Sequence, residues 1–419
     1  MSHVVQHTLS NGLTVLLKEE HTAPVVSWWV MYRVGSRNER TGTTGLSHWV
    51  EHMMFKGTER FPPGVLDRLI DRAGGQWNAF TSLDHTMYYE TLPADRIDLA
   101  LESEADRMCN ALFREEDVES ERTVIMSERR DNENSPLFWL NEELRSAAFR
   151  VHGYHHEVIG DMVDLEHITR DDLYGHYRKH YVPSNAVVVA VGSFDTTEML
   201  RQIEVLYGHI PSSPRPELFV RPEPDQQGER RVMVERPGNT TFVTLAYRVP
   251  PALHPDWMKL EIMDSILTGS GGGKTSRMYQ ALVKTGVAAH TGGGLQETID
   301  PYLYTLRATV SEHYTPEQTE KALFEQLDRL LQDGITDAEL AKAKKQAHAS
   351  FAYSTESVTN QAYWLAQSAA LGDVNWFATY LDRLNAITRE DVLHVAQTYL
   401  TPRRRIVGWL IPTSDGDSA

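Results

Sequence analysis

A pattern of helix, proline and strand that occurs twice at one spacing is the feature that most restricts how this chain can fold. The first copy occupies residues 168–183 and the second 387–402, each beginning with Ile-Thr-Arg and ending in proline fifteen positions later. An apolar run follows each proline, at 186–191 and at 406–410. Two copies of one unit indicate an internal duplication. The sequence therefore predicts two homologous domains.

Composition indicates where the boundary between these domains lies. Prolines cluster at 211–224, which is typical of an extended linker. A chain of 419 residues with 41% hydrophobic residues has enough apolar material for two cores. We therefore expect an α+β protein with two homologous α/β sandwiches, each a mixed or antiparallel sheet covered by helices. The predicted boundaries are 1–212 for the first domain, 213–228 for the linker and 229–419 for the second domain.

One short helix in the first domain carries residues typical of a metal site. Residues 45–58 have the pattern of an amphipathic helix closed by glycine, and contain His48, Glu51 and His52 in the order His-x-x-Glu-His. The histidines are four positions apart, so both imidazoles project from one face. That geometry suits a zinc ion, with Glu51 placed to accept a proton from a water on the metal. The alternative is a structural cluster, but apolar flanks predict a buried helix, where unpaired polar groups are costly.

A zinc site of this kind needs a third protein ligand and one open position for water. The helix predicted from Asp117 onward carries Glu121 and Glu128, which are seven positions apart and share a face. Either carboxylate could be the third ligand. Spacing does not choose between them, because this helix is acidic throughout.

Residues 76–90 have the pattern of a strand, a turn and a second strand. If the first strand lies at a sheet edge near the metal, its free backbone groups at Asn78, Ala79 and Phe80 could pair with an extended peptide. An interior strand of a hairpin is the equally weighted alternative.

The second domain lacks the metal-binding pattern. Its counterpart of the histidine helix, expected at 255–267, has no His-x-x-Glu-His, and the helix expected from 340 onward is basic where its first-domain counterpart is acidic. A glycine-rich segment at 269–275 looks like a phosphate-binding loop, but Thr268 stands where that pattern requires glycine and a helix-like segment precedes it. We expect a flexible loop there, followed by a helix at 277–285.

Charge and composition exclude some classes of function. The formal net charge of −17 argues against a nucleic-acid binder and is compatible with basic peptide partners. No apolar run is long enough to span a bilayer, so no membrane partner is expected. Met1–His7 shows no signal peptide, and the single cysteine, Cys109, allows no disulfide within the chain. These features predict a cytoplasmic protein, or a periplasmic one if a leader has been removed.

Together these motifs resemble the pitrilysin/insulysin family of zinc peptidases, the inverzincins. The resemblance is to the half-size branch, which includes the mitochondrial processing peptidase beta subunit and bacterial zinc-bearing subunits. In that family the third zinc ligand is a glutamate 76 positions after the second histidine, so the resemblance selects Glu128. It also matches Glu121 to a carboxylate that orients a ligand histidine through its other ring nitrogen. The segments that carry the resemblance are 45–58, 78–81, 121–128, 152–160 and 181–185.

The resemblance implies a zinc-dependent endopeptidase that cleaves unfolded peptides or short segments. Zinc would lower the pKa of its bound water towards ~7, Glu51 would take the proton, and the hydroxide would attack the peptide carbonyl. Glu51 would then pass the proton to the leaving amine. An extended peptide would lie along the strand at 78–81. The alternative is a non-catalytic scaffold subunit of a larger complex, which has no physical reason to retain the complete site.

The second domain departs from the family in one respect. Members that act alone resemble one another in an arginine and, seven positions later, a tyrosine that help to hold the substrate. The corresponding positions here are Val283 and His290. Unless His290 donates a hydrogen bond in place of the tyrosine, a related subunit must supply the Arg/Tyr pair. We therefore expect the zinc-bearing subunit of a heterodimer, with a homodimer as the alternative.

Overall fold

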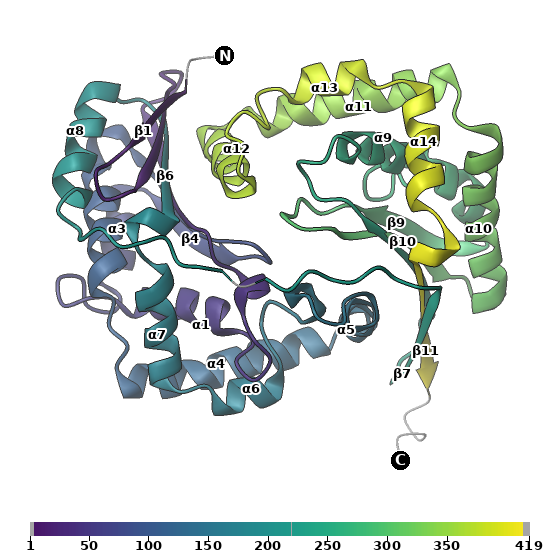
Figure 1. Cartoon of the computed structure of the whole chain (residues 1–419), viewed down its shortest axis with the longest axis horizontal. Helices are drawn as coiled ribbons and strands as arrows, with labels where there is room; N and C mark the ends of the chain where they lie inside the picture. Colours follow the sequence, from purple (N-terminus) through teal and green to yellow (C-terminus); the bar gives the residue numbers. More distant parts are fainter. Residues whose placement is uncertain (1–3, 219, 414–419) are drawn as a thin grey trace. The chain divides into compact units, whose positions relative to one another are not determined.

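The fold consists of two mixed β-sheets covered by helices, which confirms the predicted α+β class (Figure 1). A computed structural model describes residues 4–218 and 220–413 of the chain. Among these residues, none of the helices combines the length and the apolar composition that crossing a membrane requires.

The first sheet has six strands in the order β1-β2-β6-β3-β5-β4. Strand β6 lies parallel to β2 and antiparallel to β3, and the other neighbouring pairs are antiparallel. Asn11 and Gly12 lie in the turn that joins β1 to β2, and Gly12 has a φ of 93°, a conformation that glycine adopts without strain. The strands are β1 (Val5–Thr8), β2 (Thr14–Glu19), β3 (Val25–Tyr32), β4 (Gln76–Thr81), β5 (Thr86–Pro93) and β6 (Ala186–Gly192).

The second sheet has five strands in the order β7-β11-β8-β10-β9. Strand β11 lies parallel to β7 and antiparallel to β8, and β10 is antiparallel to both of its neighbours. The strands are β7 (Arg230–Pro237), β8 (Phe242–Val249), β9 (Ala288–Gly294), β10 (Tyr302–Val310) and β11 (Arg405–Thr413).

The two sheets share one topology, which confirms the predicted duplication. Apart from β1, each sheet has the same strand order, and the strand that comes last in the sequence lies parallel to the one that comes first. The helix before that last strand begins with the same capping box in both copies, built by Thr169 and Asp172 in one and by Thr388 and Asp391 in the other. The repeated sequence unit thus forms the same structure twice.

The chain packs into two compact units that do not coincide with the two halves of the sequence. Helix α12 (Val358–Leu371) comes from the second half but packs on β3 and β6 in unit 1. Helix α5 (Pro136–Ala148) comes from the first half but packs on β7 and β11 in unit 2. The domain boundaries at 1–212 and 229–419 remain a prediction, because they describe the two copies of the sequence repeat and not these compact units. Unit 1 comprises residues 1–130, 156–221 and 352–377, and unit 2 comprises residues 131–155, 222–351 and 378–419.

Helices cover both faces of the sheet in unit 1. The core under α3 and α8 includes Val188 and Ala190, and the core under α12 includes Val187, Val189 and Val191. Because side chains on both faces are buried, β6 is a continuous apolar run instead of an alternating one. The helices are α1 (Leu46–Met53), α2 (Val65–Ala73), α3 (Asp98–Asn110), α4 (Glu115–Glu133), α6 (Met162–His167), α7 (Arg170–His180) and α8 (Thr196–Tyr207), of which α4 continues into unit 2.

Unit 2 buries one face of its sheet under three helices, α9, α10 and α14. Capping boxes at Thr315 and Thr336 start α10 and α11. The helix predicted at 277–285 is present but ends earlier: residues 277–283 are helical and pass into a π-helical turn (Tyr279–Val283), in which the Lys284 N–H donates to a carbonyl five residues back. The helices are α9 (Trp257–Leu267), α10 (Pro316–Asp333), α11 (Asp337–Ser354), α13 (Tyr380–Ala386) and α14 (Arg389–Tyr399).

Candidate active site

The histidine pattern lies on helix α1, which presents its polar residues together. Trp49, Val50 and Met53 have no exposed surface and fix one face of the helix in the core of unit 1. The opposite face carries the two histidines, whose side chains are 14% and 22% exposed. A short 3-10 turn (Met54–Lys56) follows, and the chain then leaves the helix at Gly57, where φ is 81°.

His48, His52 and Glu128 form a candidate metal site. Each offers one ligand atom, and these three atoms lie within 4.8 Å of one another. Glu128 reaches the site from α4, where its Oε2 lies 3.9 Å from His48 Nε2 and 3.7 Å from His52 Nε2. Of the two glutamates left open by spacing, the structure therefore brings Glu128 to both histidine nitrogens.

This set of donors fits a zinc ion. Two imidazole nitrogens and a carboxylate oxygen leave one position open in a tetrahedral site. A histidine must be neutral to bind a metal. Burial, with a smaller effect of the neighbouring His52, lowers the pKa of His48 to about 3, which favours this neutral form. Glu128 is 43% exposed, so solvent reaches the site.

Glu121 lies behind His52 and does not face the other two ligands. Its Oε1 is 2.8 Å from His52 Nδ1, and its Oε2 contacts the ammonium of Lys56. A carboxylate can only accept here, so Nδ1 donates its proton and Nε2 is left free to face Glu128. Burial alone would lower the pKa of His52, but the hydrogen bond and the charge of Glu121 raise it.

Glu51 is held beside the two histidines by a hydrogen bond from the neighbouring strand. Thr81 Oγ1 donates to Glu51 Oε2 over 2.6 Å, and Glu51 is only 8% exposed. Burial raises the pKa of Glu51, although the Thr81 hydrogen bond opposes the rise. A carboxylate with a raised pKa is a stronger base, which suits a group that accepts a proton near neutral pH.

Strand β4 lies at the edge of the first sheet, beside α1. It pairs with β5 on one side, and no strand among residues 4–218 and 220–413 pairs with its other side. Of the two equally weighted alternatives, the structure has the edge strand and not the interior one. Asn78 is exposed, while Ala79 and Phe80 are half-buried. Thr81, the last residue of this strand, is the one that binds Glu51.

The two positions that correspond to the Arg/Tyr pair of the family, Val283 and His290, lie in unit 2. Val283 ends the π-helical turn, and His290 is exposed on β9. The glycine-rich segment follows helix α9, as expected, and a Cβ placed on Gly272 would come within 3.3 Å of His290 Nε2. His290 therefore packs against the glycine loop.

Sequence reasoning assigned no role to Lys56, and it placed Thr81 only in the strand along which a peptide would lie. Lys56 stands four positions after His52, a spacing that suggests a shared helix face. Thr81 is 30 positions from Glu51, and no sequence pattern links the two.

Two family models match the chain. The model described as "Insulinase (Peptidase family M16)" matches residues 14–162, and the one described as "Peptidase M16 inactive domain" matches residues 167–347. The first of these segments contains α1 and Glu128, and the second contains most of unit 2.

Full-length relatives agree with these models. The chain is 30% identical to the zinc protease PqqE of Helicobacter pylori over 413 residues, which cover 97% of this chain and 92% of the relative. It is 30% identical over 274 residues to a probable mitochondrial-processing peptidase subunit beta of Arabidopsis thaliana, covering 64% of this chain and 51% of that one. The crystal structure of a protease from Helicobacter pylori superposes with a TM-score of 0.94 at 29% identity and covers 98% of this chain and 100% of its own.

The likeness thus extends over nearly the whole chain, both sheets included. The fold brings His48, His52 and Glu128 together as a possible metal site. The chain therefore belongs to the insulinase family, peptidase family M16, and is a zinc metallopeptidase of that family with His48, His52 and Glu128 as its candidate metal site.

Proposed function

We propose that this chain is an endopeptidase that hydrolyses peptide bonds of unfolded peptides or of short extended segments. The observation that carries the proposal is the convergence of His48, His52 and Glu128, with Glu51 beside them on the same helix. A scaffold subunit gains nothing from holding two imidazoles against carboxylates in a largely buried site, because such groups cost free energy when they bind nothing.

The proposed mechanism assigns one task to each residue. His48, His52 and Glu128 would hold the zinc ion, and Glu121 would orient His52. Bound zinc supplies Lewis-acid chemistry, which polarises the peptide carbonyl and makes a water acidic. Glu51 takes the proton from the attacking water and later gives it to the nitrogen of the leaving amine.

We place the substrate along strand β4. The free edge of β4 offers backbone N–H and C=O groups at Asn78, Ala79 and Phe80, with which an extended peptide can pair. A folded segment cannot present its backbone in this way, since its own N–H and C=O groups are already paired. This supports the choice of unfolded or locally extended substrates.

We further propose that this chain works with a related subunit. Val283 and His290 stand where an arginine and a tyrosine would help to hold the substrate, so the partner would supply that pair. A heterodimer is the form that we favour, and a homodimer is the alternative. The Arabidopsis relative is itself named as the beta subunit of a processing peptidase.

The metal site and the base are tested separately. His48→Ala should lose bound zinc, measured by elemental analysis, because one of three ligands is gone. Glu51→Gln should keep its zinc and lose at least about a hundredfold in the rate of peptide cleavage, the range expected for a lost general base. Glu116→Gln, an exposed site on α4, is the control that should change neither. If Glu51→Gln keeps both zinc and activity, Glu51 is not the base.

The partner is tested by purifying this chain alone and measuring its oligomeric state and its cleavage of a denatured protein. We expect little activity until a related subunit is added. Full activity of the isolated monomer would contradict the need for a partner, and full activity of a self-associated form would favour the homodimer.

A further inference from the structure

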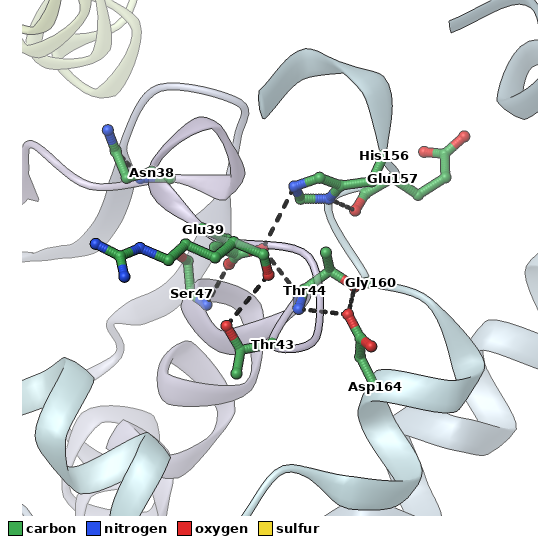
Figure 2. A network of polar contacts seen from close by, with 12 residues as sticks. Asn38, Glu39, Thr43, Thr44, Ser47, His156, Glu157, Gly160 and Asp164 are labelled. Atoms are coloured by element: carbon green, nitrogen blue, oxygen red, sulfur yellow. Dashed lines mark hydrogen bonds and ion pairs between the residues drawn. The ribbon is translucent and has the colours of Figure 1, made fainter. Parts of the chain in front are cut away.

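Glu39 is buried at the start of the metal-binding helix. Its side chain has no exposed surface. Both carboxylate oxygens accept backbone hydrogen bonds over 2.7 Å, Oε2 from the N–H of Gly45 and Oε1 from the N–H of Ser47 (Figure 2). The mechanism described above does not use Glu39.

Helix α1 has no cap of its own, so Glu39 takes that place. The first N–H groups of a helix lack partners within it, and a side chain at the N-cap position normally satisfies one of them. Here the N-cap residue is Gly45, which has no side chain to do so. The Glu39 carboxylate, from six residues upstream, binds two of these groups at the end of the helix where a negative charge is favoured.

A second carboxylate holds the loop between Glu39 and the helix. Asp164 Oδ2 accepts hydrogen bonds from the Gly42 N–H at 3.1 Å, the Thr44 N–H at 2.9 Å and the Thr44 hydroxyl at 2.7 Å (Figure 2). None of these three donors belongs to α1. Glu39 and Asp164 therefore fix the same loop, but only Glu39 also fixes the helix.

The two ligand histidines differ in how their rings are oriented. His52 is held through Nδ1 by Glu121. The Nδ1 atom of His48 is buried and has no hydrogen-bond partner among the described residues. The direction of the His48 ring therefore depends on packing and on the backbone of the first helical turn.

Ser47 links that first turn to a second helix. Its N–H donates to Glu39, and its hydroxyl lies 3.2 Å from Nε2 of His176 on α7, which is buried. Ser47 directly precedes His48, so any shift of this residue moves the ligand as well.

We infer that Glu39 is a positioning residue for the metal site, which acts by holding the first turn of α1 and thereby the ring of His48. The inference rests on the proposed function, because it takes His48 to be a zinc ligand. It adds a residue that lies outside the His-x-x-Glu-His pattern and touches neither metal nor substrate.

The ionised and the neutral form of Glu39 should hold the turn differently. A carboxylate can accept both N–H groups, whereas the neutral acid presents a hydroxyl to one of them. Burial, with a smaller effect of Asp164, raises the pKa of Glu39 to about 8, while the hydrogen bonds from Ser47 and Gly45 oppose the rise. His156, whose Nε2 lies 3.9 Å from Oε2, is the other titratable group that faces it from the neighbouring segment. The positioning effect should therefore be largest above pH 8.

The test compares Glu39→Gln with the matched control Asp164→Asn. The dissociation constant for zinc alone is measured by competition with a chelator, near pH 7 and near pH 9, together with the melting temperature of each metal-free protein. We expect Glu39→Gln to bind zinc about tenfold more weakly near pH 9, the effect typical of lost support for a ligand, and by a smaller factor near pH 7. Asp164→Asn should lower the melting temperature but leave zinc binding within about twofold at both pH values.

The inference is overturned if both variants change zinc binding by the same factor, or if the Glu39→Gln effect does not grow with pH. Should Glu39→Gln not fold, Glu39→Asp replaces it, since the shorter side chain cannot reach both N–H groups. If neither Glu39 variant folds while Asp164→Asn does, Glu39 is needed for folding and the positioning role is wrong. A wild type that binds zinc but cleaves no peptide would contradict the proposed function alone, because this test reads metal binding.

Discussion

At the scale of single residues, the contacts behind His52 extend beyond the metal ligands. Lys56 contacts one oxygen of Glu121 while His52 occupies the other. Burial would raise the pKa of Glu121, but the hydrogen bonds from His52 and Lys56 lower it. Glu121 is thus kept as an anion, which strengthens its hold on the histidine.

We therefore predict that Glu121→Gln weakens zinc binding by about tenfold to a hundredfold without abolishing it. The amide oxygen can still accept from His52 Nδ1, but the charge is lost and the amide nitrogen faces Lys56. A chelator competition assay measures the change. Glu116→Gln, on the same helix but exposed, is the control, and an unchanged affinity in Glu121→Gln would show that Glu121 does not support the ligand.

A buried group of three charges lies in the core of unit 1. Arg107 bonds to both Glu90 and Glu104, and the three side chains are at most 1% exposed. One guanidinium cannot neutralise two carboxylates in such a place. Burial, with the charge of Glu104 as a smaller cause, raises the pKa of Glu90 well above its ordinary value of 4.5.

We therefore predict that the folded protein becomes less stable as the pH rises. The unfolded chain releases the Glu90 proton above about pH 4.5, while the folded protein keeps it. The folded state therefore binds more protons, and the free energy of unfolding falls as the pH rises, by about 1.4 kcal/mol per pH unit at most. Glu90→Gln imitates the protonated acid and should remove this loss. Urea unfolding of both proteins between pH 5 and pH 8 measures it, and parallel curves would show that Glu90 is ionised in the folded state.

The sequence predicted the residues of the site whose partners lie within one helix or one motif. His48, Glu51 and His52 follow from helical spacing alone, whereas the choice of Glu128 over Glu121 required the resemblance to a family. Glu39 was not predicted, because its partners are backbone N–H groups, which every residue except proline carries, so no residue pattern marks them.

At the scale of elements, the most informative packing is that of α5 on β11. Gly408 lies in the middle of β11, and a Cβ placed there would come within 2.8 Å of Leu144 and 2.9 Å of Leu140. Both leucines are buried on α5. The absence of a side chain at Gly408 therefore lets the helix approach the strand closely.

We predict that Gly408→Val destabilises unit 2 by about 1–3 kcal/mol, the usual effect of overpacking a core. Leu144→Ala alone should destabilise it by about 2–5 kcal/mol by leaving a cavity. Since the new valine can fill part of that cavity, the double variant should lose less than the sum by at least about 0.5 kcal/mol. Chemical denaturation of the four proteins measures this, and strictly additive losses would show that the two residues are not in contact.

Topology was more predictable than helix placement. The repeated spacing predicted two similar domains, because each copy carries the same capping residue, proline and apolar strand. It did not predict that α5 and α12 pack on the sheet built by the other half of the sequence. An amphipathic helix shows which of its faces is buried but not which sheet covers that face.

At the scale of the whole molecule, the two compact units group residues that are far apart in the sequence. Unit 1 contains the candidate metal site and also α12, more than 200 residues after the last ligand. Unit 2 contains α5, which begins eight residues after Glu128. A ligand that binds only the folded form stabilises it by RT ln(1 + [L]/Kd), about 2.7 kcal/mol at a free concentration of 100 Kd.

Zinc should therefore protect α12 and leave α5 unchanged, although α5 is much closer to Glu128 in the sequence. We expect added zinc to slow amide hydrogen exchange in α1 and α12, because these helices open when unit 1 unfolds, whereas α5 opens with unit 2. Mass spectrometry of peptides with and without zinc measures the difference, and His48→Ala, which lacks a ligand, should show none. Equal protection of α5 and α12 would contradict this and show that the two units unfold as one cooperative body.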